Sequence, residues 1–301
     1  MLRIPDRLIG DAWFFPGREV VHAYFLTCDA SLPRHEHWSI GHAVSGDLVR
    51  WNDLGICLRG GGPGSWDHNL ATGSVLRHGG RYWMAYTGHT AQRVGVAVSD
   101  DLHRWERIGS GPVSGIDTRF YEPVGSGSRR VPHWRDPFLF AWEGWVYAAV
   151  CASRNGGPPD RRGTLGLSRS RDLRTWIVLP PPEVEAVGQE LECPQVVERG
   201  GRWHLLFSSA PSFFPAAHLA RHPAVAAGPN LYAMAAPTPL GPFRMLRKNP
   251  VLPPGAPYAC QLVRWRGRDV LLGTHPEQGG DGGSISDPIA VVADAEGIRP
   301  S

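Results

Sequence analysis

The sequence predicts an all-β fold, a single five-bladed β-propeller over residues 1–301, from a repeated heptapeptide and five hairpin-like stretches. The heptapeptide has the form S-x-D-L-x-x-W, and each copy follows a short run of about the length of a strand. Self-similarity at a period of roughly 40–70 residues, with several strands in each unit, is typical of a propeller or an array. The clear copies are Ser45–Trp51, Ser99–Trp105 and Ser170–Trp176, and Thr238–Phe243 is a degenerate fourth copy.

Five stretches that place a glycine turn between two apolar runs predict five hairpins. β-Branched and aromatic residues on both sides of such a turn are typical of paired strands. Five hairpin units in 301 residues give about 60 residues for each blade, which suits a propeller. A last strand over residues 287–293 is expected to close the ring with the N-terminal residues, because closure removes free sheet edges. The hairpins span residues 13–26, 73–87, 138–150, 195–207 and 261–273.

The heptapeptide predicts a structural turn in each blade. We expect its aspartate to accept hydrogen bonds from backbone N–H groups of the turn. We expect its tryptophan to pack between neighbouring blades. The turn interpretation therefore assigns no chemistry to Asp47, Asp101 or Asp172.

The composition excludes several classes of protein. The formal charge is +3 and the arginines are dispersed, so the basic stripe of a nucleic-acid-binding protein is missing. No apolar stretch approaches the ~20 residues of a membrane helix. No CxxC or HExxH motif occurs, so we expect neither a metal nor a cofactor. Five cysteines without a pairing pattern, and an N-terminus without a signal-peptide core, predict free thiols and a cytoplasmic location.

Three carboxylates stand at nearly equivalent places, just ahead of the first apolar run of a hairpin: Asp11, Asp136 and Glu192. The first strands of propeller blades line the central axis, so these acids are expected to converge on one site. Paired carboxylates are the minimum equipment for cleaving a glycosidic bond, with one protonated and one ionised. Arg135 beside Asp136 is expected to keep that aspartate ionised. His275 begins the loop after the fifth hairpin and is a further candidate to bind substrate.

These motifs, taken together and in this order, resemble glycoside hydrolase families 32 and 68, whose fold is a five-bladed propeller. The resemblance covers nearly the whole chain, without the β-sandwich that follows the propeller in family 32. The first segment is similar to W-D-x-W of family 68, and the others to W-G-H-A-x-S-x-D-L-x-x-W, G-S with Y-T-G, R-D-P and E-C-P of family 32. The segments here are Gly10–Trp13, Trp38–Trp51, Gly73–Ser74 with Tyr86–Gly88, Arg135–Pro137 and Glu192–Pro194.

The resemblance implies a retaining glycoside hydrolase, or a glycosyl-transferring enzyme, that acts on a small and fructose-containing sugar. It implies that Asp11 is the nucleophile and Glu192 the general acid/base. Asp136, with Arg135, would stabilise the transition state and grip substrate hydroxyls. The residues that would line the subsite of the attacked sugar are Trp13, Ser74 and Asp67.

Other functions stay open at this point. The propeller hydrolases of family 43 share the three-acid layout but cleave pentosides with inversion, and there Asp11 would act as a base on water. A non-catalytic sugar-binding propeller is a further alternative, although a scaffold needs none of the three acids. A third alternative is a hydrolase-like enzyme recruited to a biosynthetic step on another glycoside. The sugar, the linkage, hydrolysis against transfer, and the oligomeric state are not fixed by the sequence.

Overall fold

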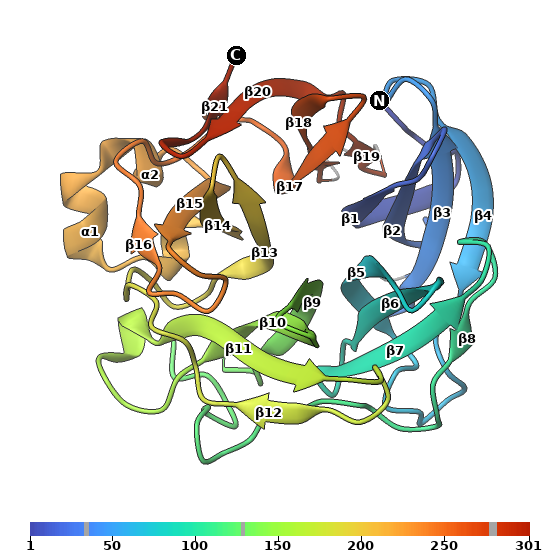
Figure 1. Ribbon diagram of the computed structural model, residues 1–301, viewed down its shortest axis with the longest axis horizontal. Coiled ribbons are helices and arrows are strands. Elements are labelled where there is room, and N and C mark those ends of the chain that lie inside the picture. The colour runs from blue at the N-terminus through green and yellow to red at the C-terminus, as the bar shows by residue number, and fades with distance from the viewer. Residues whose placement is uncertain (33–35, 128–129, 277–281) are drawn as a thin grey trace.

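Five antiparallel sheets stand around a central axis and form the five-bladed propeller that the sequence predicts. The computed structural model describes residues 1–32, 36–127, 130–276 and 282–301. Each blade begins with the strand nearest the axis and proceeds outward through strands paired in chain order (Figure 1). The described residues contain no β-sandwich beside the propeller.

The strands follow the predicted hairpins, each of which supplies the inner two strands of a blade. The first blade is β1 (Arg7–Pro16), β2 (Val21–Asp29), β3 (Ser39–Ser45) and β4 (Asn52–Leu58). The second is β5 (Leu70–His78), β6 (Arg81–Gly88), β7 (Arg93–Ser99) and β8 (Glu106–Arg107). The third is β9 (Trp134–Trp142), β10 (Trp145–Ser153), β11 (Gly163–Ser170) and β12 (Ile177–Leu179). The fourth is β13 (Glu192–Arg199), β14 (Arg202–Ser209), β15 (Asn230–Ala236) and β16 (Arg244–Met245).

The last blade differs from the expectation for ring closure. It contains β17 (Tyr258–Trp265), β18 (Arg268–His275), β20 (Ile289–Asp294) and β21 (Gly297–Pro300), with β19 (Ser284–Ile285) pairing beside β18. The tail strand expected to meet the N-terminus is therefore the third strand of this blade, because β20 pairs with β18. The N-terminal segment touches the blade through an isolated bridge between Leu2 and Ile285.

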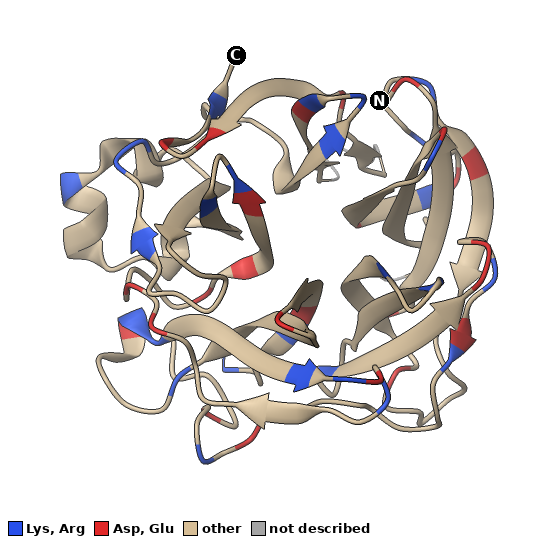
Figure 2. Ribbon diagram, viewed as in Figure 1, with Lys and Arg blue, Asp and Glu red and all other residues tan. Residues whose placement is uncertain are grey.

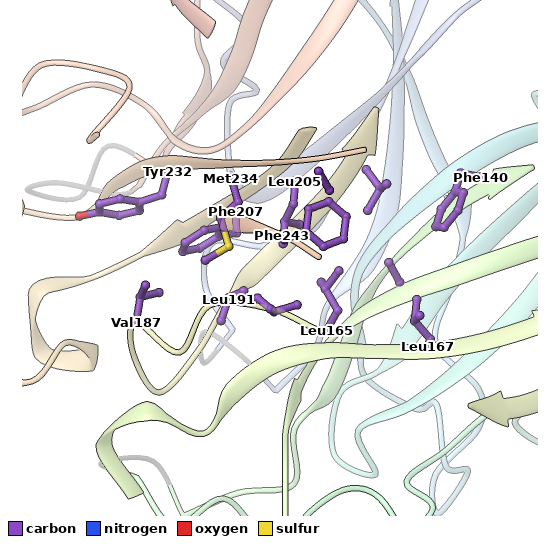
Figure 3. Packing of buried hydrophobic residues seen from close by; sticks show 14 of the residues in the cluster. Phe140, Leu165, Leu167, Val187, Leu191, Leu205, Phe207, Tyr232, Met234 and Phe243 are labelled. Atoms are coloured by element: carbon purple, nitrogen blue, oxygen red, sulfur yellow. The ribbon is translucent and has the colours of Figure 1, made fainter. Parts of the chain in front are cut away.

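Apolar side chains fill the spaces between neighbouring blades and form five clusters, one for each interface. Figure 3 shows the cluster between the third and fourth blades, where Phe140 and Leu165 face Leu205 and Phe207. Successive side chains of a strand point to opposite faces of its sheet, so each blade buries one row of side chains against each of its two neighbours. Packing against both neighbours in a closed ring thus holds the blades at fixed angles around the axis.

The repeated heptapeptide forms the same turn in each of the first three blades. In the second blade, Asp101 Oδ1 accepts hydrogen bonds from the backbone N–H groups of His103 (2.8 Å) and Arg104 (2.9 Å). Ser99 Oγ accepts from the N–H of Leu102 at 2.9 Å. The leucine has a φ of +68°, in the left-handed region, and the other two copies have φ of +67° and +56° at the same position. The aspartates therefore have the structural role that the motif predicts.

The aromatic residue of each turn lies between its own blade and the preceding one. Trp105 of the second blade meets Tyr24 of the first blade edge-on, with ring centroids 5.7 Å apart. Trp176 packs on the cluster between the second and third blades. Phe243 of the degenerate copy is fully buried in the cluster between the third and fourth blades. The motif thus ties the outer edge of a blade to its neighbour.

The turn gives a prediction about stability. Asp101→Ala removes the acceptor of two backbone N–H groups and should lower the free energy of unfolding by about 1–2 kcal/mol. Asp101→Asn keeps an oxygen at the same place and should lower it less. Urea unfolding followed by tryptophan fluorescence measures both variants. Equal losses in the two would contradict an acceptor role for this side chain.

Candidate active site

One large cavity, of about 1100 Å³, opens at the propeller axis, and all five blades line it. Its floor is made by the inner strands and its walls by loops that connect or precede other strands. Figure 2 shows acidic segments on β9 and β13 close to the axis. The lining residues include Asp11, Trp38, Thr72, His89, Gln92, Arg135, Asp136, Glu192, Cys193, Phe213, Tyr258 and His275.

Every inner strand carries a register shift at the same height, where it forms the cavity floor. In four blades, two residues of the inner strand stand opposite one residue of the second strand, which is the geometry of a β-bulge. In the second blade Thr72 is the single extra residue. The bulged pairs of the other four blades are residues 10–11, 136–137, 193–194 and 259–260.

The three acids stand at consecutive positions relative to this bulge. Glu192 is the last paired residue before it, Asp136 is the first bulged residue, and Asp11 is the second. Their positions relative to the bulge therefore differ by one residue from one of these blades to another, whereas the sequence predicts nearly equivalent places. Three bulged residues have left-handed backbones, Asp136 (φ +58°), Cys193 (φ +47°) and Ala259 (φ +50°). Non-glycine residues in this region are sparse and gather at functional sites.

Cys193 connects the three acids, because it follows Glu192 in the chain and contacts both aspartates. Its backbone N–H donates to Asp136 Oδ2 at 3.1 Å. Its Sγ lies 3.8 Å from Asp11 Oδ2, as a weak S–H donor. Burial raises the pKa of this thiol well above its usual range, so the thiol keeps the proton that it donates.

Arg135 is the cation at the centre of the acids. Its Nη2 donates to Glu192 Oε1 at 2.8 Å and also to Glu190, and its Nε lies 3.5 Å from Asp136 Oδ2. The residue is 6% exposed and Glu190 is 1% exposed. A guanidinium buried among carboxylates offsets part of their desolvation and fixes their orientation. His133 also contacts this network, since its Nε2 lies 3.8 Å from Glu190 Oε1.

Burial and mutual repulsion favour protonation of the aspartates. Burial raises the pKa of Asp136 to about 6, Asp11 and Glu192 add to the rise, and Arg135 opposes it. Burial also raises the pKa of Asp11, and Glu192 adds to that effect. The hydroxyl of Thr72 donates to Asp11 Oδ2 at 3.0 Å and counteracts the rise. Both aspartates are therefore protonated more readily than exposed carboxyl groups, so the site can hold a proton beside a negative charge.

The fifth blade contributes a proton donor. The Tyr258 hydroxyl donates to Glu192 Oε2. Burial raises the pKa of this phenol well above its usual range, and the charge of Glu192 adds to the rise. The tyrosine therefore stays protonated and holds one oxygen of Glu192 while Arg135 holds the other. The carboxyl group is fixed from two sides and faces the cavity.

The structure brings five of the eight predicted site residues together at the cavity: Asp11, Asp136, Glu192, Arg135 and His275. It places the other three outside the cavity lining.

Each of these three has structural partners instead. Trp13 is 0% exposed and packs in the core with its ring centroid 6.3 Å from that of Tyr24. Asp67 Oδ2 accepts hydrogen bonds from Arg107 Nε at 2.8 Å and from a tyrosine hydroxyl. Ser74 Oγ accepts the backbone N–H of Leu139 at 2.9 Å, which joins the second and third blades.

Two residues that sequence reasoning missed could have been found by extending the same arguments. Glu190 precedes Glu192 by two positions, and side chains two apart in an extended segment share a face. Tyr258 occupies the same position before its bulge as Glu192 and Arg135 do in their blades. An alignment of the five hairpins to the residue before each bulge would have placed it at the site.

The described residues contain no helix long and apolar enough to cross a membrane. In the same part of the chain, no group of three or more His, Cys, Asp or Glu side chains is arranged to hold a metal ion.

The pKa of Asp136 predicts how stability varies with pH. Because this pKa is raised to about 6 in the folded protein, the native state holds a proton that the unfolded chain releases above pH 4. The stabilisation from this proton is lost as the pH rises through about 6. Asp136→Asn should therefore gain in free energy of unfolding relative to the wild type between pH 4 and pH 7, by on the order of 3 kcal/mol.

Urea unfolding at pH 4, 5.5 and 7 measures this difference. Glu143→Gln, at an exposed position in the third blade, is the matched control and should show no such trend. A stability difference between Asp136→Asn and wild type that is constant with pH would contradict the raised pKa.

Comparison with known proteins gives one family match and several relatives. The profile described as "Glycosyl hydrolases family 32 N-terminal domain" matches residues 17–219. A sucrose-6-phosphate hydrolase of Escherichia coli is 26% identical over 181 residues, which cover 58% of this chain and 36% of that protein. The same enzyme of Zymomonas mobilis is 27% identical over 185 residues, which cover 57% of this chain and 34% of that protein. The matches thus span about a third of the length of these relatives.

Several solved structures share the fold over nearly the whole chain. A levansucrase of Bacillus subtilis superposes with a TM-score of 0.76 at 14% identity, covering 99% of this chain and 86% of that one. An inulosucrase of Halalkalicoccus jeotgali bound to kestose gives 0.74 at 23% identity, covering 99% and 87%. A β-fructofuranosidase of Bombyx mori in complex with sucrose gives 0.68 at 18% identity, covering 98% and 62%. The family profile covers more than half of the chain, and the fold agrees with it, so the chain belongs to glycosyl hydrolase family 32.

Proposed function

We propose that this protein is a retaining glycosidase or glycosyl-transferring enzyme that cleaves a small, fructose-containing sugar. The observation that carries the proposal is the convergence of Asp11, Asp136 and Glu192 around Arg135 in one cavity at the propeller axis. The names of the relatives support it, since they act on sucrose 6-phosphate or are bound to sucrose and kestose. A cavity of about 1100 Å³ has room for a sugar of this size.

In the proposed reaction Asp11 attacks the anomeric carbon and Glu192 donates a proton to the leaving oxygen. The hydrogen bond from Thr72 to Asp11 supports the ionised form that a nucleophile needs. Glu192 then takes a proton from the incoming water or sugar hydroxyl, whose oxygen attacks the anomeric carbon. The bond from that carbon to Asp11 breaks, and the product leaves with its configuration retained. Asp136, held by Arg135 and by the N–H of Cys193, would accept hydrogen bonds from substrate hydroxyls and stabilise the positive charge that develops.

The charges of the cavity favour an uncharged sugar over a phosphorylated one. Arg135 is the one guanidinium among the described lining residues, and carboxylates already engage it. A phosphate group is recognised by guanidinium or ammonium groups that are free to pair with it. The three acids would in addition repel a dianion. We therefore propose sucrose or a small fructo-oligosaccharide as the substrate class.

The proposed reaction predicts how substitutions of the acids change the rate. Glu192→Gln removes the proton donor and should lower kcat on sucrose by about 10²–10⁴-fold, and Asp11→Asn should abolish the covalent step and lower it further. Both variants should keep the wild-type circular dichroism spectrum. Glu143→Gln, an exposed carboxylate on the third blade, is the control and should keep full activity.

The stereochemistry is tested on the wild type with methanol as the acceptor. NMR of the first methyl fructoside formed should show the β anomer of the substrate retained. An inverted product would instead recast Asp11 as a base on the acceptor. No turnover of any fructoside by the folded protein would contradict the proposed activity.

The proposed substrate class predicts a preference for uncharged sucrose over sucrose 6-phosphate. Because the cavity offers no free guanidinium among its described residues, kcat/KM should be at least about tenfold higher for sucrose than for sucrose 6-phosphate. Initial rates of glucose or glucose 6-phosphate release measure the two substrates side by side. A preference for the phosphorylated sugar would contradict this substrate class while leaving the glycosidase proposal in place.

A further inference from the structure

A second, smaller cavity of about 250 Å³ lies beside the third and fourth blades, and none of its lining residues lines the central cavity. It is enclosed by the short helix η1 (Pro159–Arg161), by residues 185–187 ahead of β13 and by the helix α1 (Ala216–Arg221). Figure 1 shows α1 at the outer edge of the ring, away from the axis. Any ligand of this cavity would therefore be separate from the sugar at the centre.

Four basic side chains converge on this cavity from two elements. Arg161 comes from η1, and His218, Arg221 and His222 come from α1 and the residue after it. Figure 2 shows the basic end of α1 on the outer rim. Among the described lining residues, Glu185 is the one that is acidic. The cavity is therefore rich in groups that donate hydrogen bonds to an anion.

The two guanidinium groups are only weakly engaged. Arg221 donates through Nε to the carbonyl oxygen of Ala217 in its own helix, at 3.0 Å. Arg161 has Asp160 as its carboxylate neighbour, with Nε and Oδ1 4.0 Å apart and both side chains more than 40% exposed. Exposed pairs at that distance contribute little. Among the described residues, both guanidinium groups therefore keep N–H donors for a ligand.

The histidines stand close together on an aromatic support. The ring of His218 stacks on Phe214 at 5.1 Å and lies 4.4 Å from the ring of His222. Burial lowers the pKa of His218, and the nearby His222, Arg221 and Arg161 lower it further, while Glu185 opposes the effect. The carboxylate of Glu185 accepts the backbone N–H of Met245 at 2.9 Å. The described lining therefore sets two guanidinium groups against one carboxylate, and a bound anion would offset the excess of positive charge.

We propose that this cavity binds the phosphate group of a small phosphorylated metabolite. Arg161 and Arg221 would each pair with phosphate oxygens, and the imidazoles of His218 and His222 would donate to the same group. Glu185, at the same cavity, would accept a hydrogen bond from a hydroxyl of the ligand, as a sugar or polyol offers. A dianion with several acceptor oxygens fits four converging donors better than a single carboxylate would.

The proposed phosphate site does not depend on the proposed glycosidase activity, because none of its residues lines the central cavity. Isothermal titration of the whole protein with inorganic phosphate, and separately with glucose 6-phosphate, tests it. Arg161→Gln and Arg221→Gln should each weaken binding by about tenfold or more, since each removes charge-assisted hydrogen bonds. Arg202→Gln, at an exposed arginine that begins β14 of the fourth blade, is the matched control and should bind as the wild type does.

A fourth variant changes affinity in the opposite direction. Glu185→Gln removes the opposing charge, so it should bind inorganic phosphate more tightly than the wild type. Tighter binding of glucose 6-phosphate than of phosphate by the wild type would identify an organic phosphate as the ligand, and equal binding would identify free phosphate; both support the site.

Three outcomes would overturn the proposal. The first is no saturable binding of either probe. The second is binding that Arg161→Gln and Arg221→Gln leave unchanged. The third is binding that sucrose displaces, because it would place the anion in the central cavity.

Discussion

The burial of several carboxylates around one guanidinium is the constraint on which the centre of this protein depends. Arg135 has to sit where it can reach Asp136, Glu190 and Glu192 together, or their negative charges stay uncompensated away from water. That placement requires the third and fourth blades to meet at a fixed angle, which their shared apolar cluster provides. The packing between blades and the electrostatics at the axis are thus two parts of one arrangement. Tyr258 adds the fifth blade to it through Glu192, and Thr72 adds the second through Asp11.

A repeated fold needs a device that makes equivalent strands chemically different, and here the bulge has that function. Every inner strand breaks its register at the same height, but the position of the acid relative to the bulge differs by one residue among the three blades that carry one. A bulge turns neighbouring side chains away from strict alternation. Five similar hairpins therefore present a nucleophile candidate, an acid, a cation, a hydroxyl and a phenol in place of five copies of one group. The left-handed backbone of Asp136 and Cys193 is part of this arrangement.

Local signals in the sequence predicted the fold well, because hairpins and turns are set by residues close together in the chain. The heptapeptide turn and the position of the three acids follow from such signals, and the structure agrees with the sequence on both. The side-chain directions of Trp13, Asp67 and Ser74 depend instead on partners in other segments and blades, which no local pattern contains. The same is true of Glu190, whose role is defined by Arg135, 55 residues earlier. The role assigned to His275 was inferred from its loop alone, and its place at the cavity wall came from the fold.

The first and last residues of the centre also lie far apart in the chain, and this affects how the protein is made. At about 5–20 residues per second, Asp11 leaves the ribosome on the order of 10–50 s before Tyr258 does. During that interval the apolar face of the first blade that later meets Val263 and Leu272 has no partner. A nascent chain therefore carries this uncovered apolar surface until the fifth blade has been made, and it acquires a complete centre only when the ring closes. Catalysis, once measured, would report completion of the whole ring, since no fragment of it holds all the groups.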